Sequence, residues 1–143
     1  MQLFVEVFTI YLKTNGRKHL GRKASRKTLI KKLDTLVSKY IRERDQFCVQ
    51  CGKTESLTNG HIFSRRHYST RWDISDDGNC HCQCWGCNYK HSYDNYEYYK
   101  WYEKKFGIEK FEELRGKYRQ SKKYTNVDLE ELYEKIKEKY EQL

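Results

Sequence analysis

The chain has 143 residues, a length that suits one domain or one small domain with helical appendages. Only 37% of the residues are apolar and the mean hydropathy is −1.06, so the chain can build only a modest hydrophobic core. No stretch approaches the length of a membrane span, and the apolar run at residues 2–12 lacks the flanks of a signal peptide. We therefore expect neither a transmembrane helix nor a signal peptide.

The net charge of +9 is unevenly distributed along the chain. Residues 1–45 carry twelve basic and four acidic side chains, whereas the two kinds nearly balance from residue 46 onward. A positive excess at one end favours a polyanionic partner, with nucleic acid ahead of a membrane surface. The alternative is a lysine-rich face that is only solvated.

The spacing of apolar residues predicts a helix, two short strands and three helical stretches, at residues 26–44, 57–63, 79–82, 85–107, 109–118 and beyond Thr125. Ser25 can cap the first of these helices, and Asp128 is a capping partner for Thr125. The helix over residues 109–118 is expected to bury Ile108. Residues 2–12 fit either a strand or a short helix.

The stretch from Tyr93 to Tyr102 is rich in aromatic residues, which we interpret as helix packing rather than a platform for stacked bases. The last helix carries an apolar stripe from Leu129 to Tyr140. This stripe either covers the core or forms the contact of a homodimer, and the sequence does not decide between them.

Two C-x2-C pairs, Cys48/Cys51 and Cys84/Cys87, predict a zinc site. Four thiolates on two tight turns form a closed tetrahedral site, which is typical of structural zinc, and metal binding would add folding free energy to a small core. Cys80 and Cys82, in the second predicted strand, are alternative ligands, but Cys84/Cys87 repeats the spacing of Cys48/Cys51. We interpret Cys80 and Cys82 as small buried thiols on opposite sides of the strand. Thiolate–zinc chemistry indicates a reducing compartment, so we expect a cytoplasmic protein.

Residues between and just after the cysteine pairs could hydrolyse a phosphodiester. A neutral imidazole such as His61, at a predicted strand end, can take a proton from water near pH 7. Asn79, on the opposing strand, could orient that ring. Asn88 follows Cys87 directly and could bind a divalent cation through its amide oxygen, with His91 three residues further on.

The order of these motifs, CVQCG, GHIFSRRHYSTRWD and QCWGCN, resembles the zinc-stapled branch of the HNH (His-Me finger, ββα-metal) nucleases. Within that branch the chain looks most similar to the phage NinG/Rap recombination proteins. The resemblance runs from about Ser25 to Gly107. It implies an α+β fold with a ββα-metal core stapled by the four-cysteine zinc site, with helices flanking the core on both sides.

The resemblance implies that His61 is the general base, that Asn79 is its orienting partner, and that Asn88 is a ligand of a catalytic Mg2+ or Mn2+ ion. Many members of the wider family have Asp just before the base, as a second metal ligand. This chain has Gly60 there, as the NinG-like form does, so the second ligand is unassigned. Three residues could fill it, in decreasing order of preference: Asp73, His91 and Asp94.

The loop after the first strand carries Arg65, Arg66 and Arg71, which we expect to contact DNA phosphates, although basic loops are often only solvated. Asp73 could instead form a salt bridge with Arg71.

These observations divide the chain into a basic N-terminal segment (1–27), a zinc-stapled HNH domain with its leading helix (28–107) and a C-terminal helical extension (108–143). The expected function is metal-dependent cleavage of DNA. The resemblance implies branched DNA, such as a Holliday junction or a strand-invasion intermediate, in phage recombination within the bacterial host cell. One alternative is a zinc-stapled DNA-binding module without catalysis. Another is a sequence-specific HNH nuclease, which would need a reading element that the sequence does not reveal.

Overall fold

The computed structural model describes residues 23–143, so the predictions for residues 2–12 and for most of the basic segment lie outside the described part. The described elements follow in the order α2 (Arg26–Asp45), β1 (Leu57–His61), β2 (Cys80–Cys84), α3 (Trp85–His91), α4 (Tyr96–Phe106), α5 (Ile108–Arg119) and α6 (Asn126–Glu141). Helices around one two-stranded sheet confirm the α+β class. None of these helices is long and apolar enough to span a membrane.

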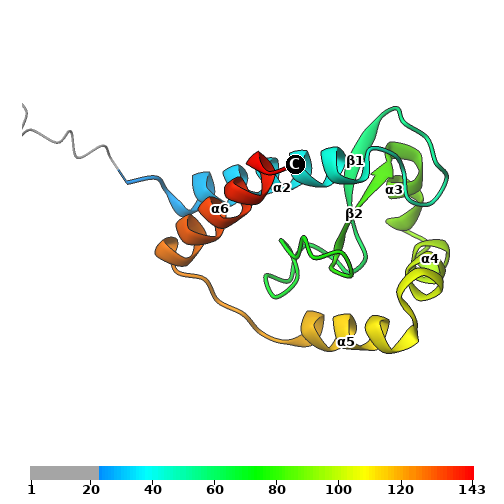
Figure 1. Ribbon diagram of the computed structural model, residues 1–143. Coiled ribbons are helices and arrows are strands. Elements are labelled where there is room, and N and C mark those ends of the chain that lie inside the picture. The colour runs from blue at the N-terminus through cyan, green and yellow to red at the C-terminus, as the bar shows by residue number, and fades with distance from the viewer. Residues whose placement is uncertain (1–22) are drawn as a thin grey trace, which may run out of the picture.

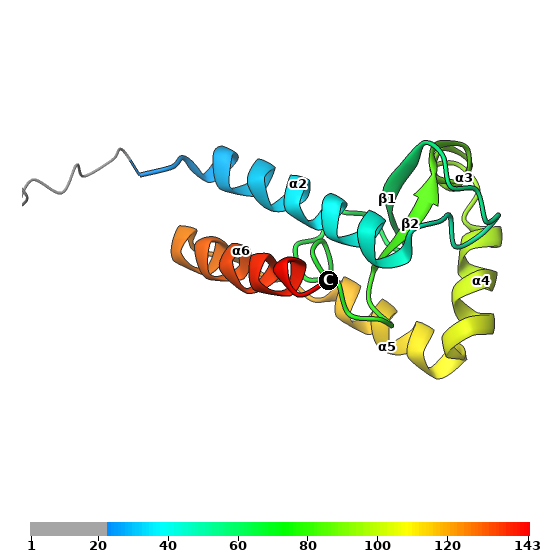
Figure 2. The same ribbon diagram turned by 45° about the horizontal axis from the view of Figure 1, so that its top comes forward.

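The helices surround the sheet and the long loop that joins its strands (Figure 1). Figures 1 and 2 both show α2 and α6 side by side, with the sheet, α3 and α4 at the other end of the molecule. The loop between β1 and β2 contacts α2 through Arg71 and Asp34, and it contacts α5 through Ser69 and Tyr118. The loop is therefore anchored on two sides.

Helix α2 forms where the apolar spacing predicts it. The Ser25 side chain accepts a hydrogen bond from the Thr28 amide at 3.2 Å, which satisfies one of the free amides of the first turn. The buried face consists of Leu29, Leu33, Leu36, Val37 and Ile41. The helix ends at Gln46, whose φ of 64° is left-handed and turns the chain toward the first cysteine pair.

Strands β1 and β2 are antiparallel, with Gly60 opposite His81 and His61 opposite Cys80. Cys80 and Cys82 both pack into the core against α2. The interpretation that they lie on opposite sides of the strand is wrong, because residues two apart on a strand share a face.

The helical stretch predicted for residues 85–107 is interrupted, and this part of the prediction is wrong. Helix α3 ends at His91, and α4 starts at Tyr96 after a turn in which Asp94 Oδ1 accepts a hydrogen bond from the Tyr96 amide at 3.0 Å. Ile108, which was expected to be buried, is 56% exposed because it begins α5 instead of preceding it.

Two apolar clusters hold these elements together. In the first, α6 lays its apolar stripe along α2, and Cys80 and Cys82 of β2 pack against α2 at its other end. In the second, α4 and α5 pack around Ile62 and Phe63, the two residues that follow β1. The C-terminal extension thus contributes to both clusters, and the stripe of α6 covers the core. The expected capping box is present, since Thr125 and Asp128 bond each other reciprocally.

Candidate metal centre and active site

The four predicted zinc ligands come together at one end of the sheet. The sulfur atoms of Cys48, Cys51, Cys84 and Cys87 all lie within 4.8 Å of one another. The Cys51 and Cys84 sulfurs are 3.7 Å apart. A tetrahedral zinc ion with Zn–S bonds of about 2.3 Å would separate its sulfurs by about 3.8 Å. The cluster therefore has the dimensions of a four-thiolate metal site.

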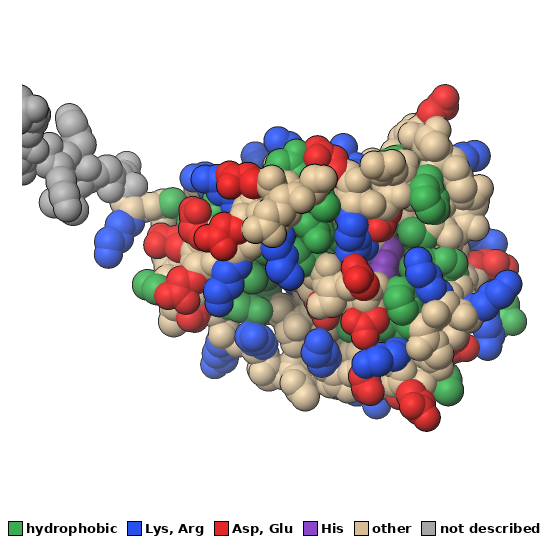
Figure 3. Space-filling view, in the orientation of Figure 1, with side chains coloured by type: hydrophobic (Ala, Val, Ile, Leu, Met, Phe, Trp, Pro, Cys, Tyr) green, Lys and Arg blue, Asp and Glu red, His purple; other side chains and the backbone are tan. Residues whose placement is uncertain are grey.

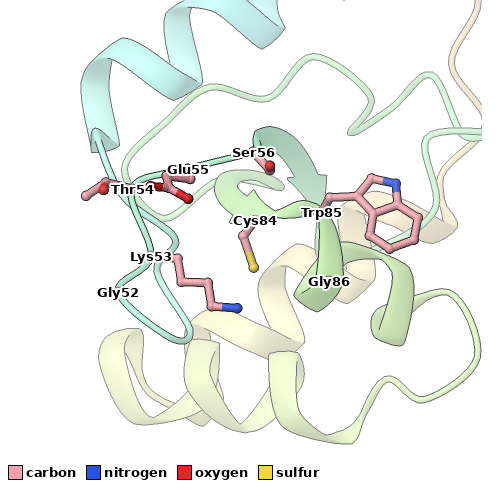
Figure 4. Close-up of a pocket in the computed structure, with 8 residues that line it drawn as sticks. All are labelled: Gly52, Lys53, Thr54, Glu55, Ser56, Cys84, Trp85 and Gly86. Carbon is pink, nitrogen blue, oxygen red and sulfur yellow. The ribbon is translucent and has the colours of Figure 1, made fainter.

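Backbone hydrogen bonds shape both turns of this cluster. The Gly52 amide donates to the Cys48 carbonyl at 2.8 Å, and Gly52 has a φ of 76°, a left-handed value that glycine adopts freely. Cys84 ends β2 and caps α3, so its sulfur accepts a bond from the Cys87 amide at 3.5 Å. Figure 4 shows the Lys53 side chain reaching into the same space as Cys84, where its ammonium group can offset thiolate charge.

Cys80 and Cys82 do not join the cluster. Burial raises the pKa of each thiol to about 12, so both remain protonated at neutral pH. A protonated thiol is a poor zinc ligand. The prediction that these two residues are buried thiols is confirmed.

His61 lies at the end of β1 with its ring turned toward the loop. The Nε2 atom is 3.1 Å from the carbonyl oxygen of Arg71. A carbonyl can only accept, so Nε2 carries the proton and Nδ1 is left with a free lone pair. Burial lowers the pKa of His61 to about 4, and the bond to the Arg71 carbonyl, which favours the charged ring, offsets this only in part. At neutral pH the ring is a neutral base.

A second layer of contacts holds the Arg71 carbonyl in place. Asp34, on α2, accepts hydrogen bonds from Arg71 Nε and Nη2 at 2.9 and 2.6 Å. The same carboxylate accepts from the Trp72 indole at 2.8 Å. Asp34 therefore fixes the backbone on which the His61 ring rests.

Asn79 is fully buried next to this site, but its amide does not bond the imidazole. Its Oδ1 accepts from the Phe63 amide at 2.8 Å and its Nδ2 donates to the Phe63 carbonyl at 2.9 Å. The side chain acts like an additional strand residue and fixes the chain immediately after His61. Its hydrogen bonds thus position the base through the backbone and not through the ring.

Asn88 faces β1 from α3. Its Nδ2 donates to the Thr58 hydroxyl at 3.0 Å, and that hydroxyl donates its own proton to the Gln83 carbonyl at 2.9 Å. Because the hydroxyl proton is already used, Asn88 must present its NH2 group to Thr58. The Asn88 Oδ1 atom is then directed away from Thr58 and can bind a cation.

The other three metal-ligand candidates are engaged in structural contacts. His91 Nε2 lies 3.0 and 3.1 Å from the carbonyls of His61 and Ile62, so it donates to them and ties α3 to the end of β1. Asp73 accepts from Ser75 and pairs with Lys117. Asp94 accepts from the Tyr96 amide, as described above. The suggested pair between Asp73 and Arg71 does not form, since Arg71 pairs with Asp34.

The three arginines expected to contact DNA differ in availability. Arg65 and Arg66 are exposed. Arg71 is half-buried, bonds Asp34 through two nitrogens and donates to the Arg65 carbonyl at 3.0 Å through the third. Arg65 and Arg66 are therefore the free cations of this loop, and Arg71 has a structural role.

A family model described as bacteriophage lambda NinG protein matches residues 12–143. The chain belongs to the NinG family. No curated protein and no solved structure matches it. The matched region begins in the N-terminal segment and extends through residue 143. It therefore includes α5 and α6 as well as the four-cysteine cluster.

Two residues of the NinG site carried no recognisable signal in the sequence. Asp34 is an isolated acid in a lysine-rich helix, and its two partners lie 37 and 38 positions later. Gln83 is fully buried, and its Oε1 atom has no hydrogen-bond partner among the described residues. Strand alternation could have placed Gln83 on the same face as Thr58 and Gly60, but only the fold shows that α3 covers that face.

Proposed function

We propose that this NinG-family chain is a metal-dependent DNA endonuclease that hydrolyses phosphodiester bonds, with branched DNA as its substrate. The observation that carries the proposal is the state of His61. The Arg71 carbonyl holds the proton on Nε2, and burial keeps the ring neutral, so Nδ1 is a fixed base at neutral pH.

The base, His61 on β1, and the amide ligand, Asn88 on α3, lie on opposite faces of β1. Thr58, which anchors Asn88, and His61 are three positions apart, so their side chains point to opposite sides of the strand. In an in-line displacement the attacking water and the leaving oxygen also lie on opposite sides of phosphorus. A phosphate along the unpaired edge of β1 would meet His61 on one side and Asn88 on the other.

Asn88 is the described residue that suits a divalent cation shared with the substrate. Its Oδ1 is a neutral amide oxygen on the α3 side of β1, whereas Gln83 Oε1, on the same side, is fully buried. Mg2+ accepts such oxygens but normally keeps several waters and binds substrate phosphates. When bound, the ion would stabilise charge on the phosphate and the leaving oxygen. We infer that it binds mainly together with DNA.

The test is incubation of the purified chain with linear, forked and four-way DNA, with and without Mg2+ or Mn2+. We expect cleavage of the branched substrates only with the cation present. His61→Ala should abolish cleavage while leaving DNA binding and zinc content unchanged. His67→Ala is the matched control, because His67 is an exposed histidine that packs on Tyr118. Normal cleavage by His61→Ala would overturn the assignment.

A second candidate is a DNA-binding module without catalysis. Position 60 is glycine, and the described residues offer no free carboxylate beside Asn88, since Asp73 and Asp94 are engaged. The same incubation separates the two candidates. Binding of branched DNA without cleavage in either cation selects the module, and a discrete cut in linear duplex selects a sequence-specific nuclease.

A further inference from the structure

The outer side of α3 carries exposed aromatic rings. Trp85 and Tyr89 are 63% and 58% exposed, and Tyr93, just past the helix, is 71% exposed. The rings of Trp85 and Tyr89 are stacked, with centroids 5.2 Å apart and planes 8° apart, and Tyr93 meets Tyr89 edge-on at 5.7 Å. We call these three residues the aromatic ridge.

The aromatic ridge is not part of either apolar cluster. Helix α3 has no buried residue, whereas Tyr98 and Tyr102 of the following helix are fully buried. The packing interpretation of the aromatic stretch therefore holds for Tyr98 and Tyr102 but fails for Tyr93 and Tyr96. Large rings that remain in solvent, stacked on each other rather than on the core, need another explanation.

The aromatic ridge adjoins the proposed active site. Trp85 lies three residues before Asn88, and Tyr89 follows it directly on the same helix. Trp85 lines the same pocket as Lys53 and Cys84, and Figure 4 shows its indole pointing away from the Cys84 sulfur and the Lys53 ammonium group. A group stacked on Trp85 would thus lie outside the metal centre but within a helical turn of Asn88.

The chemistry of this surface favours a nucleic-acid base over an apolar protein segment. The aromatic ridge contains flat rings and no aliphatic side chain, and flat rings accept any base because every base has a π-face. From residue 85 to residue 93 there is no acidic residue, and Lys90 lies exposed between Tyr89 and Tyr93. Exposed rings supply stacking surfaces for bases, and an exposed lysine in the same segment supplies charge for a phosphate.

We propose that the aromatic ridge binds unpaired bases of DNA, by stacking them on Trp85 and Tyr89 next to the scissile phosphate. This inference rests on the proposed function and specifies its substrate, because fully paired duplex has no free base face to offer. Unpaired or easily opened bases occur at the branch point of forked and four-way DNA. Recognition of branched DNA would then come from α3 itself.

The experiment measures binding without cleavage, in buffer without added Mg2+ or Mn2+. Trp85→Ala and Tyr89→Ala are compared with the unchanged protein on a duplex, on the same duplex with a four-nucleotide gap, and on a four-way junction. We expect each variant to lose roughly tenfold in affinity for the gapped and branched DNA, a typical effect of removing one stacking ring. Affinity for the intact duplex should change less than about twofold. Trp85→Phe, which keeps a ring, should retain most of the preference.

Tyr96→Ala is the matched control, since Tyr96 is an exposed aromatic residue whose ring lies under Lys100 and not in the stack. Zinc content is measured for every variant because Trp85 is adjacent to Cys84. Equal losses on duplex and gapped DNA, or no loss on either, would overturn the proposal. So would a change from dimer to monomer in sedimentation with unchanged DNA preference, which would assign the aromatic ridge to a second copy of the chain. Absence of cleavage in the incubation above leaves this binding result intact, so the two failures are distinguishable.

Discussion

The side chain of Gln83 occupies the space that a β-carbon at Gly60 would need. An ideal β-carbon there would lie 2.6 and 2.7 Å from Gln83 Cδ and Cγ. The two residues share one face of the sheet because Gly60 pairs with His81 and Thr58 pairs with Gln83. The aspartate found before the base in many HNH nucleases therefore has no room here unless Gln83 moves.

Gly60→Ala and Gly60→Asp should both destabilise the fold. Gln83 is fully buried and its amide donates to Gln50, so it cannot move aside without breaking that contact. We expect the free energy of unfolding to fall by about 1–3 kcal/mol, as overpacking usually costs, measured by denaturant titration. Gly116→Ala is the control, because a β-carbon there meets nothing within 4 Å, and a helical alanine should stabilise by about 1 kcal/mol. Unchanged stability of Gly60→Asp would show that Gln83 is not fixed.

The zinc site should account for the metal content of the protein. We expect one zinc ion per chain by atomic absorption, lost in Cys48→Ser and Cys87→Ser together with cooperative thermal unfolding, because binding free energy is folding free energy. Cys80→Ala should keep its zinc, since that thiol packs into the core against α2. A protein that loses zinc through Cys80→Ala but not through Cys87→Ser would reverse the ligand assignment.

The sequence predicted what local spacing controls and missed what the tertiary fold controls. The C-x2-C pairs and the apolar periodicity of α2 were sufficient to place the metal cluster and the leading helix, because both depend on neighbours a few residues away. The break between α3 and α4 occurs at a turn in which the Asp94 carboxylate accepts from the Tyr96 amide. The turn lies inside an aromatic-rich stretch whose apolar spacing continues without a break. Asp34 and Arg71 meet across 37 positions, and no local pattern indicates such a pair.

His61 should remain an active base well below pH 6.5. Burial lowers the pKa of His61 to about 4, so the acidic limb of kcat/KM for cleavage should fall near that value and not near 6.5. The stability of the fold should follow the same group. Between pH 6.5 and about 4 the unfolded chain binds a proton that the folded chain does not, so the free energy of unfolding falls as the pH falls. His81, with a pKa also lowered by burial to about 4, adds to this loss.

Urea unfolding at pH 7 and pH 5 isolates the contribution of His61. His61→Ala should show a smaller loss of stability between these pH values than the unchanged protein does, because only His81 and His91, whose pKa values burial also lowers, then remain. An equal loss in both proteins would mean that His61 titrates normally in the folded state.

Asp34→Ala should impair His61 as a base, although Asp34 does not contact the His61 ring. Removing the carboxylate frees Arg71 and Trp72, so the carbonyl that holds His61 Nε2 loses its support. We expect kcat to fall more than KM changes, and the unfolding free energy to fall by about 1–3 kcal/mol, since one member of a partly buried pair remains unpaired. Lys100→Ala, which removes an exposed pair with Glu103, should leave the free energy of unfolding nearly unchanged.

The Asp34 carboxylate should also make the free energy of unfolding depend on pH in the acid range. Burial alone would raise the pKa of Asp34, but hydrogen bonds from Arg71 and Trp72 bring it below 3.8. Its contribution to stability is therefore present above pH 3.8 and is lost as the pH falls through the lower pKa of the folded state. Asp34→Asn should remove this acid dependence while keeping the shape of the side chain. If acid unfolding were identical in Asp34→Asn and the unchanged protein, the charge of Asp34 would not contribute to the acid dependence of stability.

The arginines of the loop should separate into two classes when DNA binding is measured against salt. Arg65→Ala and Arg66→Ala should weaken binding of all DNA forms alike and reduce the slope of log K against log salt by about 1 each, as expected for exposed phosphate contacts. Arg71→Ala should instead lower the free energy of unfolding, because its guanidinium group pairs with Asp34. If Arg71→Ala kept full stability and reduced the salt slope as much as Arg65→Ala, Arg71 would be a phosphate contact. In that case a group other than the Asp34–Arg71 pair would have to fix the Arg71 carbonyl that bonds the His61 ring.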